Sequence, residues 1–165
     1  MGYAIYYHLP FPVRRGLVRL AMARYVVGAV ALVRDSEATG AGSLLLLRQP
    51  AGVGWSLPAG LLKRGEPPSI GCARELREES GLDIDPGDLT PAAPNAVVHT
   101  RGMWVDMVFE AAVPASAATL VADGIEVLEA RFHPLDNLPP LTSATARLLS
   151  YYGIGPYTDY PEIRA

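Results

Sequence analysis

Acidic residues gather in one short segment of this 165-residue chain. Glu75, Glu78 and Glu79 follow one another at helical spacing, and Glu66 precedes them. At 100° per residue the three later glutamates occupy an arc of roughly 100° on one helix face. Carboxylate oxygens this close together are ligands that Mg²⁺ or Mn²⁺ prefers, particularly where substrate phosphates complete the coordination shell. A solvated acidic helix face is the alternative that the glutamates alone leave open.

A helix is the element that must position these glutamates. The run Pro68–Ser80 predicts it, because the Pro67-Pro68 pair suits a helix start and Gly81 suits a C-terminal end. We expect the face opposite the glutamates to be buried. Its apolar residues are Ile70, Ala73 and Leu76.

Charge repulsion within this helix also points to a cation. Glu75 and Glu79 form a like-charge i,i+4 pair, which costs an isolated helix a few tenths of a kcal/mol. Arg74 stands four residues before Glu78 and offsets part of that repulsion. A helix selected for stability alone would more often have a lysine among these acids.

The spacing around the glutamates matches a known pattern. From Gly60 to Leu82 the chain reads G-x5-E-x7-R-E-L-x-E-E-x-G-L. With every fixed position filled, this run resembles the complete signature of the Nudix hydrolases. The preceding WSLPAG at residues 55–60 resembles the usual lead-in of that family, and a weaker resemblance extends over residues 25–150. The resemblance implies an α/β (α+β) fold, an α/β/α sandwich around a mixed β-sheet.

The resemblance also implies a reaction. Members of that family hydrolyse a nucleoside diphosphate linked to another group, for example a nucleotide sugar, ADP-ribose or an NTP-like substrate. The expected cofactor is Mg²⁺, with Mn²⁺ as a substitute. Divalent metals neutralise the diphosphate, lower the pKa of bound water and hold the attacking and leaving oxygens in line. The alternative is a non-catalytic nucleotide-binding or sensing module of the same fold, against which the intact glutamates argue.

The same resemblance implies roles for individual residues. Arg74 would hold the carboxylates in position, and Glu66 would act from the loop as a water-bridged or indirect ligand. A main-chain carbonyl at Ala59 or Gly60 would help to hold the metal. The full set of expected metal ligands is Glu75, Glu78, Glu79, Gly60 and Glu66.

The carboxylate that removes the proton from the attacking water stays open. The candidates are Glu79 and Glu75 within the signature and Glu126 and Glu129 outside it. Together with Arg74, Glu79 and Glu75 make up the expected catalytic group. Lys63 departs from the family pattern, because many relatives have glutamate there. It either alters the metal number, touches a substrate phosphate or lies in solvent.

Apolar runs predict the strands that carry this helix. The Thr39-Gly40-Ala41-Gly42 stretch separates the first two runs and indicates a hairpin with a long loop. Thr142 is placed to cap a final helix that Gly153 ends. Strands mixed with two or three helices indicate an α/β or α+β layered domain. The four predicted strands are Tyr25–Arg34, Ser43–Arg48, Met103–Val113 and Ile125–Phe132.

The N-terminal residues predict a separate element. Met1–Pro12 is expected to be an irregular arm, and Val13–Arg24 has the spacing of a short amphipathic helix with arginines around its apolar face. This helix packs against the domain or a second subunit, or binds an anionic partner or membrane surface. We therefore divide the chain into an arm at 1–24, a Nudix-type domain at 25–155 and a tail at 156–165. The arm is the segment we assign to a homodimer interface.

Composition restricts the setting. The net charge of −3 shows no basic excess, which argues against a dedicated nucleic-acid binder. The single cysteine, Cys72, excludes an intramolecular disulfide and fits a reducing cytoplasm. The longest apolar run, Tyr25–Val33, is far short of the ~20 residues of a membrane helix, and the N-terminus does not resemble a signal peptide. We expect a cytoplasmic protein with a small nucleotide-type substrate and no membrane partner. A capped or triphosphate RNA end is the one nucleic-acid substrate we retain.

The sequence does not select one substrate. Trp104, Phe109 and Tyr25 are side chains that would stack on a base or pack in the core. His99 and His133 are expected to be hydrogen-bonded residues of the fold rather than catalysts.

Overall fold

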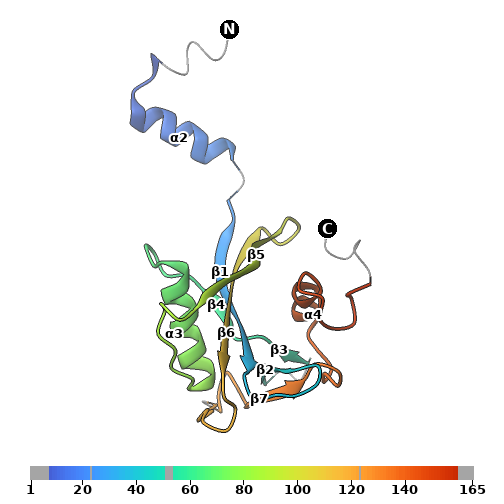
Figure 1. Ribbon diagram of the computed structural model, residues 1–165. Helices are drawn as coiled ribbons and strands as arrows, with labels where there is room; N and C mark the ends of the chain where they lie inside the picture. The colour runs from blue at the N-terminus through green and yellow to red at the C-terminus, as the bar shows by residue number, and fades with distance from the viewer. Residues whose placement is uncertain (1–7, 23, 51–53, 123, 160–165) are drawn as a thin grey trace.

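The fold is a three-layer sandwich. The structure is a computed structural model that describes residues 8–22, 24–50, 54–122 and 124–159 (Figure 1). Within these ranges a seven-stranded mixed sheet lies between helix α3 (Pro68–Ser80) on one face and helix α4 (Ser143–Ser150) on the other. The expected α+β class and α/β/α layering are confirmed.

The sheet joins strands that are distant in the sequence. Its path runs β3 (Trp55–Ser56), β2 (Ser43–Arg48), β1 (Val26–Asp35), β6 (Trp104–Val113) and β5 (Thr90–His99). Two further strands branch from it, β4 (Ala59–Leu61) on β1 and β7 (Glu129–Pro134) on β2. Strands β1 and β6 run parallel, and the other pairs are antiparallel.

Strand β1 lies at the centre of two hydrophobic cores. Its alternate residues Ala29, Ala31 and Val33 pack on the side of α3, and Val30 and Leu32 pack on the side of α4. All five are nearly inaccessible to solvent. Burial on both faces explains why this strand is a continuous apolar run in the sequence rather than an alternating one.

Helix α3 has the bounds that the sequence predicts. Pro68 opens it after an extended Pro67, and Gly81 ends it in the left-handed conformation (φ 73°) with its N–H bonded to the Arg77 carbonyl. The predicted burial of Ile70 is wrong, because this side chain is 47% exposed. The helix turns Gly71 and Cys72 inward instead, since the missing side chain of Gly71 lets Leu62 approach closely.

The predicted strands differ from the observed ones mainly at their ends. Strand β2 has the predicted bounds, and β1 is shifted by one residue at each end. Strand β6 starts after Met103, whose φ of 57° belongs to a turn. The last strand begins at Glu129 rather than Ile125, because its ladder with β2 opens at the Arg48–Glu129 pair. Ile125 is 79% exposed in the preceding loop.

Strand β5 was not predicted. It contains Pro91 and Pro94, residues that argue against a central strand. It tolerates them because it lies at the edge of the sheet, and its register with β6 shifts between Pro91 and Ala96.

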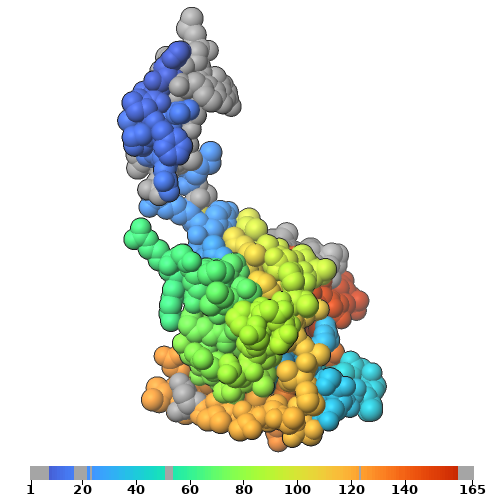
Figure 2. All heavy atoms as spheres, turned by 60° about the vertical axis from the view of Figure 1, so that its left-hand side comes forward, coloured from blue at the N-terminus to red at the C-terminus, as the bar shows by residue number. Residues whose placement is uncertain are grey.

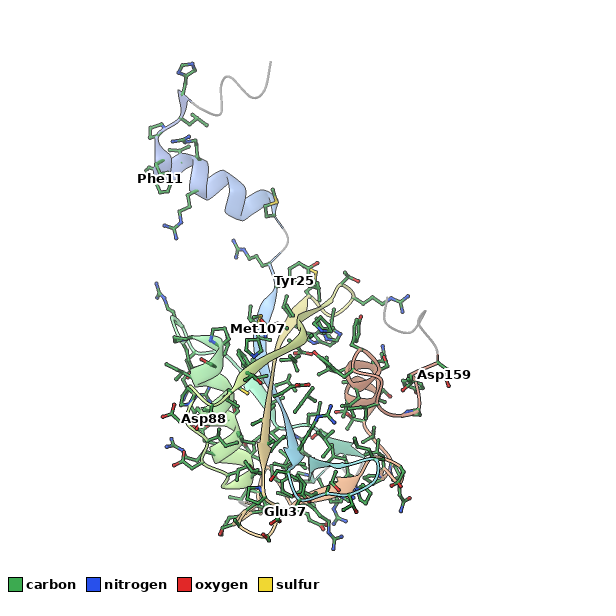
Figure 3. The ribbon with its side chains drawn as sticks, viewed as in Figure 1. Phe11, Tyr25, Glu37, Asp88, Met107 and Asp159 are labelled. Atoms are coloured by element: carbon green, nitrogen blue, oxygen red, sulfur yellow. The ribbon has the colours of Figure 1, made fainter. Side chains whose placement is uncertain are left out.

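The N-terminal helix stands away from the sandwich. Helix α2 (Phe11–Ala21) begins two residues before the expected Val13 and ends three before the expected Arg24, so Phe11 and Pro12 belong to it rather than to an irregular arm. It projects from the body in Figures 1 and 2, and Phe11 lies apart from side chains of the sheet such as Met107 (Figure 3). Phe11 is 68% exposed. Residues 1–7 of the expected arm lie outside the described residues.

Helix α4 begins where the sequence predicts, but it ends at Ser150 rather than at the predicted Gly153. The Thr142 side chain accepts a hydrogen bond from the Thr145 N–H, and Gly153, with φ 70°, follows the helix end. Among the described residues no helix has the length and apolar character needed to cross a membrane.

Candidate functional site

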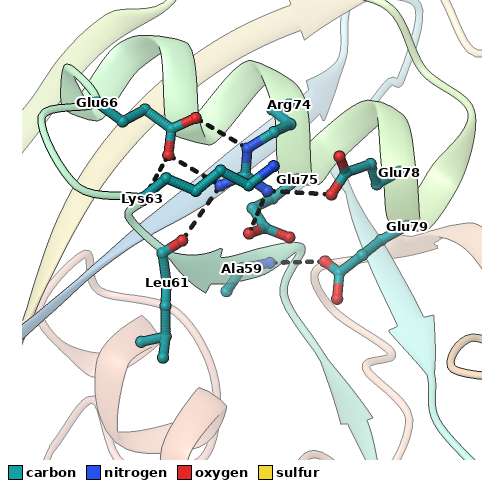
Figure 4. Close-up of polar contacts among 8 residues, drawn as sticks. All are labelled: Ala59, Leu61, Lys63, Glu66, Arg74, Glu75, Glu78 and Glu79. Atoms are coloured by element: carbon teal, nitrogen blue, oxygen red, sulfur yellow. Dashed lines mark hydrogen bonds and ion pairs between the residues drawn. The ribbon is translucent and has the colours of Figure 1, made fainter.

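Strand β4 and helix α3 bring the glutamates to the sheet (Figure 4). Strand β4 pairs with the centre of β1, with Ala29 opposite Gly60 and Val30 opposite Ala59. The Ala59 N–H donates a 2.8 Å hydrogen bond to Glu79 Oε2. This bond ties the last turn of α3 to the strand that carries the expected main-chain ligand.

Gly60 and Glu75 fit one another closely. The Glu75 carboxylate lies against the Gly60 Cα, in the space that a Cβ would fill. A glycine is therefore required here for Glu75 to keep its place. The Glu75 carboxylate therefore lies beside the backbone of Gly60, whose carbonyl is an expected metal ligand.

Arg74 is the centre of the carboxylate cluster (Figure 4). Its Nε and Nη2 donate to the two oxygens of Glu66 at 2.9 and 3.0 Å, and its Nη1 donates to Glu75 Oε1 at 2.6 Å and Glu78 Oε2 at 3.0 Å. Nη2 also reaches the Leu61 carbonyl at 3.2 Å. The guanidinium thus fixes three carboxylates at once, which agrees with the holding role expected for it.

Glu66 forms a two-point ion pair with Arg74. The paired guanidinium and the Lys63 N–H, which donates to Glu66 Oε2 at 2.8 Å, lower the pKa of this carboxyl from 4.5 to about 2. The same contact raises the pKa of Arg74 above its usual value. Both oxygens of Glu66 are engaged, so the geometry supports an anchor for Arg74. Lys63 is exposed, and it acts on this cluster through its main-chain N–H and through the charge of its side chain.

The donors present fit a hard divalent cation. Across the described residues no group of three or more His, Cys, Asp or Glu converges as a ready metal site. Arg74 instead shares Glu75 and Glu78. The Glu75 and Glu79 carboxylates and the adjacent Gly60 backbone offer only oxygen donors, which is the set that Mg²⁺ and Mn²⁺ prefer.

The two candidate bases outside the signature come from β7 and from the loop before it, a loop whose Val121 N–H donates to the Ser80 carbonyl at the end of α3. Glu126 is exposed in the loop before β7. Glu129 opens β7, the strand that pairs with β2, and its carboxylate lies 3.6 Å from Arg131. The signature glutamates are instead joined to one another through Arg74 and β4.

Asp106 is a site residue that the sequence did not single out. It stands in register with Gly28 on the parallel β1–β6 pair. A Cβ added at Gly28 would meet the Gly60 carbonyl oxygen at 3.2 Å and Asp106 Oδ1 at 3.4 Å, so these two oxygens flank the same point. A carboxylate within a largely apolar strand, which Asp106 shares only with Glu110, is the signal that could have identified it.

The other candidate aromatic and imidazole side chains separate in the structure. Phe109 is buried in the core beneath α3, and Tyr25 is partly exposed before β1. His99 Nε2 lies 2.8 Å from Asp106 Oδ2, as expected for a hydrogen-bonded residue of the fold. His133 packs edge-on against Trp55 with a centroid separation of 4.3 Å. Its buried Nε2 has no hydrogen-bond partner among the described residues, so the prediction of a hydrogen-bonded residue is wrong for His133.

Comparison with known proteins gives consistent matches. A model of the NUDIX domain matches residues 22–152. The "Putative ADP-ribose pyrophosphatase YjhB" of Bacillus subtilis (strain 168) is 32% identical over 100 residues, 60% of this chain and 48% of that protein. A "MutT-like protein" of Streptomyces ambofaciens is 40% identical over 68 residues, 41% of this chain and 42% of that protein. The chain thus spans about half the length of the curated relatives it matches.

Solved structures resemble the same sandwich. A MutT NUDIX hydrolase from Burkholderia pseudomallei superposes with a TM-score of 0.56 at 27% identity, covering 74% of this chain and 93% of that one. A MutT protein from Methanosarcina mazei Go1 gives a TM-score of 0.52 at 27% identity, covering 68% and 79%.

Proposed function

This chain belongs to the NUDIX family, and from that premise we propose that it hydrolyses a diphosphate bond in a nucleoside diphosphate linked to another group, with Mg²⁺ as its metal. The observation that carries the proposal is the packing of the Glu75 carboxylate against Gly60, beside the bond from the Ala59 N–H to Glu79. The Glu75 and Glu79 carboxylates thus contact two consecutive strand residues, Gly60 and Ala59, which supports the proposal.

Each site residue has its own role in the proposed reaction. Glu75 and Glu79, with the Gly60 carbonyl, would hold the cation, and Glu78 would be a further ligand. A bound divalent cation supplies charge neutralisation of the diphosphate and activation of water. Glu75 and Glu79 are also the carboxylates placed to take the proton of the attacking water. Arg74 keeps both the orientation and the spacing of this group, and Glu66 anchors Arg74.

We extend the substrate class from the names of the relatives. ADP-ribose, nucleotide sugars and nucleoside triphosphates are the first substrates to test, and the setting we propose is the cytoplasm. The division into an arm at 1–24, a hydrolase domain at 25–155 and a tail at 156–165 belongs to the same proposal, with the arm serving a homodimer.

A non-catalytic nucleotide-binding module is the second candidate. The observation in its favour is that Arg74 already pairs with Glu66, Glu75 and Glu78. A cation must compete with this guanidinium for two of these carboxylates.

Release of phosphorylated products from a substrate panel distinguishes the two candidates. The panel holds ADP-ribose, nucleotide sugars, dinucleoside polyphosphates, NADH, nucleoside triphosphates and capped RNA, each with Mg²⁺, with Mn²⁺ and with EDTA. We expect turnover of at least one compound that EDTA abolishes. A folded protein that binds nucleotides and cleaves none of them would favour the binding module.

A further inference from the structure

A cavity lies on the α4 side of the sheet. It has a volume of about 300 Å³ and opens between the end of the β5–β6 hairpin and the first turns of α4. This size is at the lower end of the range for small-molecule sites. The lining residues that matter here are His99, Arg101, Trp104, Ser143, Arg147 and Tyr151.

One wall of this cavity is a fixed aromatic platform. The His99 and Trp104 rings stack with centroids 4.5 Å apart and an interplanar angle of 21°. Asp106 Oδ2 holds both rings, at 2.8 Å from His99 Nε2 and 3.3 Å from Trp104 Nε1. The indole also lies against the Gly102 Cα, where any side chain would collide with it. Rings held in this way offer a preformed surface to a nucleobase.

The other walls are cationic. Arg101 comes from the hairpin turn and Arg147 from α4, and both are exposed to solvent at the cavity. Neither forms an ion pair with another described residue, and no acidic residue lines the cavity. Guanidinium groups match phosphate in charge and geometry. The chain has a net charge of −3, yet two arginines without an ion pair face this cavity. A neutral nucleobase alone would not need two positive charges beside it.

Asp106 connects this cavity to the glutamate cluster. Its Oδ2 fixes the aromatic platform, while its Oδ1 lies beside Gly28 together with the Gly60 carbonyl oxygen. Asp106 thus lies between the aromatic platform and the part of β1 that faces Gly60.

We propose that the cavity binds the nucleoside end of a substrate that has a phosphate monoester on its ribose, in addition to the diphosphate that is cleaved. The inference rests on the proposed function and deepens it. Trp104 and His99 contact the base, and Arg101 and Arg147 bind the ribose phosphate. The substrate class is accordingly a nucleotide of the 2′- or 3′-phosphorylated type rather than one with a free ribose.

Tryptophan fluorescence tests this without hydrolysis. The chain has two tryptophans, so Trp55→Phe leaves Trp104 as the sole reporter in the cavity wall. In EDTA, this protein is titrated with AMP, adenosine 2′,5′-bisphosphate, adenosine 3′,5′-bisphosphate and inorganic phosphate. Calorimetric titration of the wild-type chain with the same compounds guards against an effect of the reporter substitution.

We expect one bisphosphate to bind at least about tenfold more tightly than AMP, because charge-assisted hydrogen bonds to the extra phosphate are added. The 2′ and 3′ isomers identify the position of that phosphate. Arg101→Ala and Arg147→Ala should each remove most of this preference and leave AMP binding within about threefold. Arg131→Ala is the matched control, since Arg131 is an exposed arginine on β7 and should change nothing.

Equal affinities for AMP and both bisphosphates would overturn the proposal, as would equal effects of Arg101→Ala and Arg131→Ala. Binding of none of the nucleotides would also overturn it. These failures are separable from failure of the proposed function. If ADP-ribose is hydrolysed as well as its analogue with an extra phosphate on the adenosine ribose, the cavity proposal alone is refuted. Tight bisphosphate binding without hydrolysis of any diphosphate removes the proposed function alone.

Discussion

Replacing Gly60 by alanine perturbs the centre of the candidate site with a single methyl group. The new Cβ would enter the space that the Glu75 carboxylate occupies, so Glu75 must swing away from β4. Its 2.6 Å bond to Arg74 Nη1 is then lost or weakened. The backbone itself tolerates alanine, since Gly60 is not among the glycines with positive φ.

The structure separates the effects of this change on stability and on activity. Loss of one charge-assisted hydrogen bond, partly screened because it lies near solvent, lowers the free energy of unfolding by about 1–2 kcal/mol. For a chain of this size that corresponds to a melting temperature lower by roughly 2–8 °C. Displacement of a catalytic group by about 1 Å costs on the order of 100-fold in rate. We therefore expect a folded protein that has lost about 99% of its kcat/KM.

Gly60→Ala and Gly16→Ala are compared with the wild type in two measurements. These are the thermal melting curve and the steady-state hydrolysis of the best panel substrate. Gly16 lies in α2, where an added Cβ meets no atom within 4 Å, so this control should retain wild-type kinetics. Wild-type kcat/KM in Gly60→Ala would refute the reasoning, because it would show that Glu75 does not need its place against β4.

Three further predictions concern the same cluster. The pKa of Glu66 near 2 lies below its usual 4.5, so its ionised form adds stability that is present above pH 4.5 and is lost as the pH falls toward 2. Glu66→Gln should therefore flatten this part of the pH dependence of the free energy of unfolding, measured by urea unfolding. An unchanged pH dependence would contradict the prediction. Arg74→Lys should lower kcat at least about tenfold, because an ammonium cannot fork onto Glu66 while it holds Glu75, and wild-type kcat would count against that role. Mg²⁺ should raise the melting temperature of the wild type and much less that of Glu79→Gln, whereas equal shifts would place the cation elsewhere.

The sequence predicts this fold where local signals agree with tertiary packing. Helix α3 has its predicted bounds because prolines at its start and Gly81 at its end fix both termini. Strand β1 is predictable because both of its faces are buried. Strand β5 is not, since its prolines contradict strand propensity and only its position at the sheet edge permits them.

The candidate site is predictable where it depends on helical spacing. The common face of Glu75 and Glu79 follows from the helix, and so does the pairing of Arg74 with Glu78. The two-point ion pair between Arg74 and Glu66 joins the helix to the preceding loop. Helical spacing does not predict it, because Glu66 lies outside the helix. Asp106 lies beside Gly28, as the Gly60 carbonyl oxygen does, because of the parallel β1–β6 register, which depends on the whole sheet.

Hydrolysis by the wild type, by Glu79→Gln and by Glu37→Gln in the presence of Mg²⁺ tests the central claim most directly. Glu37 is a matched control, because it is an exposed glutamate in the β1–β2 loop whose carboxylate accepts hydrogen bonds from the Ser116 N–H and hydroxyl. We predict that the wild type and Glu37→Gln cleave a diphosphate substrate at equal rates, and that Glu79→Gln is at least about 100-fold slower with a normal melting curve. Equal cleavage by all three proteins would contradict the account.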